Sequence, residues 1–77
     1  MHRGFILLNC DLGAEEYIVD ELKQMQDIGN AYLTFGAYDV IAEIQSENQD
    51  GFEKAIANIR KLSRVVSTMT LNVISHK

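Results

Sequence analysis

Hydrophobic positions follow two different periods along this chain, and the change from one period to the other predicts six elements. Residues 5–10 and 65–74 are runs rich in apolar and β-branched side chains, which is typical of strands. On either side of Gly36, apolar and polar residues alternate with a period of two, and this pattern predicts strands at 31–35 and 38–45 joined by a hairpin turn.

Two other segments have helical spacing. Residues 13–25 place an apolar side chain on one face at each turn, and two glutamates fall in the first turn, where the helix dipole favours anions. The segment 52–62 carries a clearer amphipathic stripe, made of Phe52, Ala55, Ile56, Ile59 and Leu62. Ser46 or Asn48 is expected to cap this second helix.

The predicted order is βαββαβ. Two successive strand–helix–strand units with right-handed crossovers give an α+β, ferredoxin-like sandwich over residues 1–77, in which two helices cover one face of a four-stranded antiparallel sheet. In the last strand one face carries Met69 and Leu71, and the other carries Val66 and Ile74, so neither face is fully polar. An exposed apolar sheet face is normally an interface, and we therefore expect a face-to-face dimer of the dimeric α+β barrel type.

Composition narrows the class of protein. A chain of 77 residues has a marginal core, and its single cysteine, Cys10, excludes an internal disulfide. His2 and His76 are near opposite ends, and no zinc spacing, phosphate loop or dinucleotide fingerprint is present, so we expect no metal, no cofactor and no catalytic residue. The net charge of −4 argues against direct binding to nucleic acid. The apolar run at the N-terminus is too short for a signal peptide or a membrane span, and a lone cysteine suggests the cytoplasm.

The stretch FGAYDVIAEI carries the most informative chemistry. On its residues alone it has two interpretations: an ordinary hairpin, in which Gly36 takes a positive φ, Asp39 bonds its own backbone and Tyr38 packs, or a cradle for a small ligand. In the second interpretation the glycine turn offers N–H groups to a carboxylate, and the aspartate offers a partner to an ammonium. These are the two charges of a free α-amino acid.

Hydroxyl side chains in the last strand form a second candidate. Ser67, Thr68 and Thr70 are explained by β-propensity, or they complete a polar site across an interface. Cys10 is expected to be a buried small hydrophobe, because no base is near it in the sequence. The carboxylates of the first helix are expected on its solvated face.

Three segments together, NCDLGAEEYIVDEL, AYLTFGAYDVIAEI and SRVVSTMTLNVI, resemble the effector-binding (RAM) domain of the Lrp/AsnC transcriptional regulators. The resemblance covers nearly the whole chain, and its most specific part is the G-x-Y-D hairpin followed by an apolar strand. Family members usually carry a DNA-binding helix-turn-helix domain before this module. The sequence passes from Met1-His2-Arg3 directly into the first strand, and it therefore resembles a stand-alone form of the module.

The resemblance implies a regulatory function. It implies dimers that associate further, into an octamer or decamer, with a free amino acid bound between dimers. The family's hairpin site maps onto Gly36, Ala37, Tyr38 and Asp39, and its last-strand hydroxyls map onto Ser67, Thr68 and Thr70. Such a protein would sense an amino acid and act on transcription indirectly, through full-length Lrp/AsnC regulators as partners.

Three alternatives stay open at this point. The same architecture hosts small monooxygenases and isomerases, for which the mid-strand candidates are Asn9, Glu43 and Asn72. An ACT-like module would bind an amino acid at a glycine-containing loop such as residues 11–13. A structural oligomerisation domain would bind no ligand. The sequence does not name the amino acid, although Tyr32, Phe35 and Met69 are candidate walls for its side chain.

Overall fold

The computed structural model describes residues 1–74 and has the predicted order of elements. These elements are β1 (His2–Cys10), α1 (Glu15–Lys23), β2 (Ile28–Leu33), β3 (Val40–Ser46), α2 (Gln49–Arg60) and β4 (Val65–Asn72).

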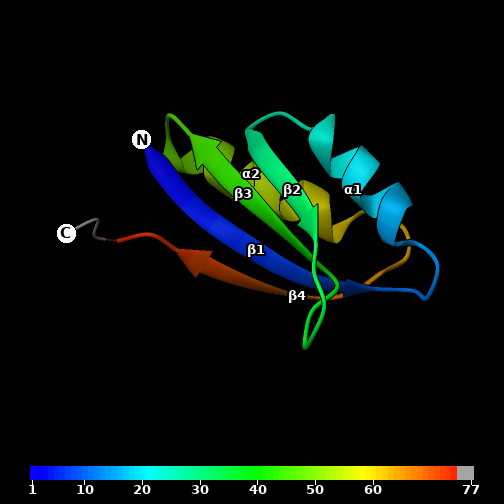
Figure 1. Ribbon diagram of the computed structural model, residues 1–77. Coiled ribbons are helices and arrows are strands. Elements are labelled where there is room, and N and C mark those ends of the chain that lie inside the picture. Colours follow the sequence, from blue (N-terminus) through cyan, green and yellow to red (C-terminus); the bar gives the residue numbers. More distant parts are fainter. Residues whose placement is uncertain (75–77) are drawn as a thin grey trace.

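The four strands form one antiparallel sheet in the order β2-β3-β1-β4, so β1 lies between β3 and β4 while β2 and β4 are the edges. Both helices cover the same face of this sheet, and the other face is left open (Figure 1). The ferredoxin-like α+β fold expected from the sequence is thereby confirmed.

The hydrophobic core lies between the sheet and the two helices. Alternate residues of β1 and β3 are buried there, including Ile6, Leu8 and Ile44, and they meet the apolar stripes of α1 and α2. Gly4 belongs to the same buried face, where a Cβ would lie 2.7 Å from Cζ of Phe52. The absence of a side chain at Gly4 therefore lets the Phe52 ring pack directly on β1.

The two helices begin differently. The Asn48 side chain accepts a hydrogen bond of 2.8 Å from the backbone N–H of Gly51, so Asn48, one of the two predicted candidates, is the cap of α2. The first helix has no side-chain cap. Its first turn carries Glu15 and Glu16, whose negative charge stabilises the partly positive helix N-terminus.

Several element boundaries differ from the prediction. The β2 strand runs from Ile28 to Leu33 instead of 31–35, and β3 begins at Val40 instead of Tyr38. The connection is therefore a loop of residues 34–39 and not a tight turn. A hydrogen bond of 2.9 Å from Thr34 N–H to the Asp39 carbonyl closes this loop, and the strands stop pairing at that point.

A register shift between Asn9 and Cys10 in the β1–β4 ladder changes which residues face the core. It pairs Val65 with Cys10 and places Val65 against the core, whereas Ser67 pairs with Asn9. The two-residue alternation of the sequence predicts Val65 and Ser67 on one face of the strand. This prediction is wrong, because the bulge adds a residue to one strand.

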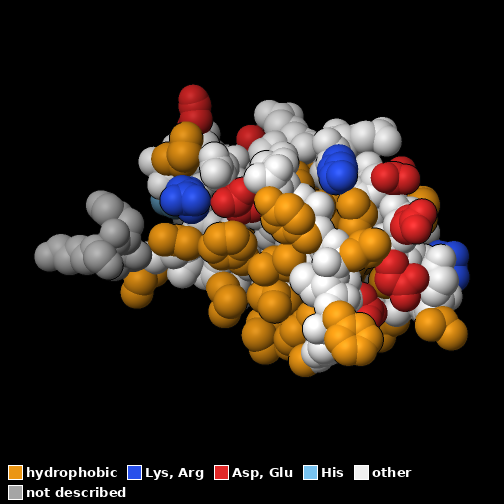
Figure 2. Space-filling model, viewed as in Figure 1, with side chains coloured by type: hydrophobic (Ala, Val, Ile, Leu, Met, Phe, Trp, Pro, Cys, Tyr) orange, Lys and Arg blue, Asp and Glu red, His pale blue; other side chains and the backbone are white. Residues whose placement is uncertain are grey.

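The open face of the sheet is largely apolar. It carries Phe5 and Leu7 from β1 and Ile41 from β3, and it is completed at the edge strands by Tyr32, Met69 and Leu71, which are 55%, 47% and 51% exposed. Figure 2 shows hydrophobic side chains gathered in a continuous patch over this part of the molecule. We call these six residues the open-face patch.

Candidate functional site

The loop between β2 and β3 projects beyond the end of the sheet (Figure 1). Gly36 has φ of +140°, which an L side chain rarely adopts, so the predicted positive φ is confirmed. A Cβ at this position would meet no atom within 4 Å, so the backbone conformation and not crowding requires the glycine. Residues 34–37 are all exposed, and the loop backbone is open to a ligand or a neighbouring chain.

Asp39 fixes the base of this loop to β1. Its Oδ2 accepts a hydrogen bond of 3.0 Å from the backbone N–H of Cys10, and its own N–H donates to the Leu8 carbonyl at 3.0 Å. The ordinary interpretation of the hairpin expected the aspartate to bond its own backbone, and it bonds β1 instead. One carboxylate oxygen is thus engaged, while Oδ1 has no protein donor within residues 1–74.

Tyr38 links the loop to the far edge of the sheet. Its hydroxyl donates to Sδ of Met69 at 3.6 Å, and its carbonyl accepts from the Thr34 hydroxyl at 2.7 Å. Met69 belongs to the open-face patch, so the phenol lies at the border between the loop and this patch. The loop therefore combines exposed backbone, a half-buried aromatic ring and a carboxylate within four consecutive residues.

The hydroxyl residues of β4 divide between the two faces of the sheet. Ser67 pairs with Asn9 and is on the same face as the open-face patch. Thr68 and Thr70 pair with Leu8 and Ile6, so they are on the helix-covered face. Within one chain the seven candidate residues do not form a single pocket. Of the three hydroxyl residues, only Ser67 is on the face that Tyr38 borders.

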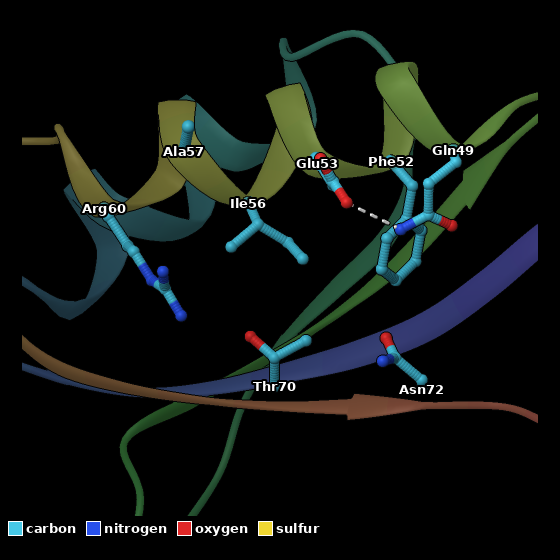
Figure 3. A pocket seen from close by; sticks show the side chains of 8 residues that line it. All are labelled: Gln49, Phe52, Glu53, Ile56, Ala57, Arg60, Thr70 and Asn72. Carbon is cyan, nitrogen blue, oxygen red and sulfur yellow. Dashed lines mark hydrogen bonds between the residues drawn. The ribbon is translucent and has the colours of Figure 1, made fainter.

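Thr70 lines an open groove between α2 and β4 that the sequence did not reveal (Figure 3). Thr68 Oγ1 accepts a hydrogen bond of 3.3 Å from Nε of Arg60, and Thr70 lines the groove itself. The sequence held one indication of this groove. Thr68 and Thr70 are two residues apart and so share a strand face, and Glu53 and Arg60 are seven residues apart and so share a helix face.

Two residues considered for enzymatic chemistry, Glu43 and Cys10, have structural surroundings. Glu43 pairs with Arg3 at 3.5 Å and accepts from Asn30 at 3.3 Å. Cys10 is buried, as expected, and burial together with the nearby Asp39 carboxylate raises the pKa of its thiol above the ordinary value of 9.0. A raised pKa makes a cysteine less reactive, which does not suit a nucleophile.

Two further kinds of site were considered from the sequence: a ligand loop at residues 11–13 and a metal site. Asp11 pairs with Arg64 at 3.5 Å, and Gly13 has φ of +88°, so this loop has a structural role in joining β1 to α1. Among the residues that the structure describes, no group of three or more His, Cys, Asp and Glu side chains is placed to hold a metal ion. His76 lies outside the described residues.

In this fold two helices cover one face of the sheet, the other face is open and apolar, and a glycine-containing loop projects beyond its end. The family model of the Lrp/AsnC ligand binding domain matches residues 3–77. The chain therefore belongs to the Lrp/AsnC ligand-binding domain family, as the resemblance had indicated.

Solved structures agree with this assignment. The hypothetical protein PHS023 from Pyrococcus horikoshii shares 27% identity with a TM-score of 0.90, covering 99% of this chain and 93% of its own. The protein FFRP-DM1 shares 28% identity with a TM-score of 0.91, covering 96% of this chain and 100% of its own. The transcriptional regulator NMB0573 from Neisseria meningitidis, solved in complex with L-Met, shares 14% identity and the fold, with a TM-score of 0.81, over 97% of this chain and 53% of its own.

A search of curated proteins found no match. Across residues 1–74, neither helix has the length and apolar character needed to cross a membrane.

Proposed function

We propose that this chain is an amino-acid-binding regulatory module, acting as one domain over residues 1–77 in the cytoplasm. The observation that carries the proposal is the loop of residues 34–39. Asp39 holds the base of this loop on β1, while its tip exposes backbone and borders the open-face patch. Membership of a ligand-binding domain family favours binding over catalysis as the function.

The chemistry of the loop suits a free amino acid. The exposed backbone at Gly36 and Ala37 can donate N–H groups to the ligand's carboxylate, and Oδ1 of Asp39 can accept from its ammonium group. The Tyr38 ring supplies an apolar wall. The complex of NMB0573 with L-Met gives one amino acid that a protein of this fold accepts, and it makes L-Met the first ligand to test.

Assembly is the second part of the proposal. A domain of this size has a marginal core, and the open-face patch would leave several large apolar side chains in water. We propose that two copies bury this patch against each other, and that dimers associate further into an octamer or decamer. The loop and Ser67 of one protomer then approach a neighbouring protomer, and Thr68 and Thr70 enter the same site only across such an interface.

Regulation follows if the ligand binds one assembly state more tightly than another, because only a difference in affinity can shift the equilibrium. Full-length Lrp/AsnC regulators are the proposed partners, since they carry the same kind of domain and can share the same interfaces. The chain would then influence transcription by forming mixed assemblies with these regulators.

The test is a thermal-shift screen against the common amino acids, with L-Met included. A ligand at ~100 times its dissociation constant stabilises the protein by about 2.7 kcal/mol, which is a shift on the order of 10 °C for a domain of this size. We expect the shift in the wild type, its loss in Asp39→Asn and its retention in Asp20→Asn, which removes an exposed carboxylate from α1. A flat response of the wild type at millimolar concentrations would refute the proposal.

A further inference from the structure

The open face of the sheet carries charged strand residues at one end only. There Arg3 on β1 and Glu43 on β3 are diagonal neighbours, since Arg3 pairs with Gln45 and Glu43 pairs with Phe5. Nη2 of Arg3 lies 3.5 Å from Oε2 of Glu43, and Asn30 donates to the other carboxylate oxygen at 3.3 Å. We call Arg3 and Glu43 the charged pair, and it adjoins the open-face patch at Phe5.

The charge of this face differs from that of the whole chain. The chain has a net charge of −4, whereas the described strand residues of the open face include one cation and one anion, Arg3 and Glu43, and so have no net charge. Two copies can approach through a neutral face without the repulsion that an excess of carboxylates would cause. A face with one charge of each sign is also complementary to itself. These properties favour a second copy of this chain as the partner that covers the patch.

Both members of the charged pair have hydrogen-bonding capacity that a single chain does not use. The Glu43 side chain is 21% exposed, and each of its oxygens has one donor within residues 1–74, although a carboxylate can accept more. The Arg3 side chain is 46% exposed, and its guanidinium group contacts Glu43 through a single nitrogen. A purely apolar cover would take water away from both groups without replacing it, which is costly for buried charges. The covering surface must therefore supply charge at this end of the face.

The symmetry of a dimer determines which residues meet. A face-to-face dimer of identical chains has a two-fold axis in the plane between its sheets, and aligned sheets keep their strands within about 30° of each other. If the axis runs along the strands, between the central strands β1 and β3, then β1 of each copy lies over β3 of the other. Arg3 of each copy then lies over Gln45 of the other and beside its Glu43, within reach of the long arginine side chain.

The other simple orientation is less favourable. If the axis runs across the strands, the charged pair of each copy lies over the opposite end of the other face, where Asn9, Ser67 and Met69 are uncharged. The pair would then lose water without gaining an opposite charge. The charged pair therefore favours the first orientation, in which the two charged ends meet.

We propose that Arg3 and Glu43 select the partner and the orientation of the open-face interface: Arg3 of each copy binds Glu43 of a second copy, and the two sheets pair with their charged ends together. The inference rests on the face-to-face assembly of the proposed function and adds to it a rule for partner choice. A related chain can replace the second copy where it carries the same charges at these two positions. A chain with reversed charges is excluded, because like charges would then meet across the interface.

The first experiment uses a variant in which the two charges are exchanged, Arg3→Glu combined with Glu43→Arg. The exchange keeps an ion pair within each chain, so the variant is expected to form its own dimer with nearly the wild-type dissociation constant. In a mixed dimer, however, Arg3 of the wild type would meet an arginine and Glu43 would meet a glutamate. Isotope-labelled wild type is mixed with the unlabelled variant, and native mass spectrometry counts the dimers. We expect mixed dimers to be roughly tenfold or more rarer than random exchange predicts.

Asp11→Arg combined with Arg64→Glu is the matched control. Asp11 and Arg64 form an ion pair of the same length, 3.5 Å, in loops outside the sheet, so exchanging them is expected to leave mixing with the wild type random. Random mixing of the Arg3 and Glu43 exchange variant would overturn the inference and leave the face-to-face assembly standing. A wild type that is monomeric, or whose dimer survives Leu71→Glu, would refute the assembly and the inference together.

Milder variants make the same test if the exchanged charges prevent folding. Arg3→Gln and Glu43→Gln each remove one charge and keep a polar side chain, and circular dichroism checks that both proteins fold. Homodimers of either variant lack the ion pair altogether, whereas a mixed dimer regains one contact between Arg3 of one chain and Glu43 of the other. An equal mixture is therefore expected to contain more mixed dimers than random exchange gives. Purely random mixing would contradict a contact across the interface.

Discussion

The carboxylate of Asp39 accepts a hydrogen bond of 3.0 Å from the backbone N–H of Cys10, across 29 positions of sequence. Cys10 is the last residue of β1, where its pairing with β3 has already ended at Leu8 and its register with β4 shifts. The N–H at this point has no strand partner, and the aspartate supplies one. Asp39 is thus a structural residue as well as a candidate ligand contact.

Substitutions of Asp39 are expected to separate these two roles. Asp39→Ala leaves the Cys10 N–H without its acceptor and is expected to lower the free energy of unfolding by about 1–3 kcal/mol in urea denaturation. Asp39→Asn keeps a carbonyl acceptor at the same place, so the free energy of unfolding should fall by less than about 1 kcal/mol. Equal losses in both variants would show that the charge, and not the hydrogen bond, stabilises the loop.

Gly4→Ala is expected to destabilise the protein by about 1–3 kcal/mol, measured by the same denaturation. Its Cβ would lie 2.7 Å from both Cζ of Phe52 and the Leu71 carbonyl, so the helix and the edge strand would have to move apart. Gly29→Ala is the control in β2. The nearest atom there is Oε1 of the flexible Glu43 side chain at 3.2 Å, and the change is expected within ~0.5 kcal/mol. Similar losses in both variants would contradict the tight packing of Phe52 on β1.

Asn48→Ala removes the cap of α2 and is expected to cost about 0.5–2 kcal/mol of stability. Asn58→Ala, at an exposed position of the same helix, is the matched substitution and is expected to be neutral or slightly stabilising because alanine favours the helix. Thermal denaturation followed by circular dichroism compares the two. A loss from Asn58→Ala as large as that from Asn48→Ala would argue against the capping bond.

Cys10 makes stability depend on pH at the alkaline end. Burial and neighbouring carboxylates raise the pKa of the thiol above 9.0, so above this pH the unfolded chain releases the thiol proton more readily than the folded one. This contribution to stability is complete below pH 9.0 and is lost as the pH rises through the folded-state pKa. We expect the wild type to lose more stability than Cys10→Ala between pH 8 and pH 10. Parallel pH profiles for the two proteins would contradict the raised pKa.

The open-face patch is expected to hold two protomers together. Leu71→Glu places a charge in the patch of each protomer and removes two leucines per dimer, so the dissociation constant should rise roughly 100-fold or more. Sedimentation or light scattering over a range of concentrations measures this change. Leu12→Glu, at a position 94% exposed outside the patch, should leave the assembly unchanged. Loss of assembly in Leu12→Glu instead would place the interface elsewhere.

Local patterns were sufficient to predict the order of the elements and, except at the beginning of β4, which residues of one element share a face. The stripe of Phe52, Ala55 and Ile59 and the alternation of Ile6 and Leu8 follow from the 3.6-residue and two-residue periods of the backbone. Gly36 and Asn48 were also predictable, because a positive φ and a helix cap are requirements of the residue itself. The family, too, was recognisable from three stretches of sequence.

Contacts between distant segments were decided only by the tertiary structure. The bulge that turns Val65 toward the core depends on the register of β4 against β1. The hydrogen bond from Cys10 to Asp39 depends on where β1 and β3 stop pairing. The groove that joins Thr70 to Glu53 and Arg60 exists because a helix lies over an edge strand. Sequence periodicity determines the face on which a residue lies, since that is a local property of one element. The neighbour that it meets there is determined by packing between elements, which no local period records.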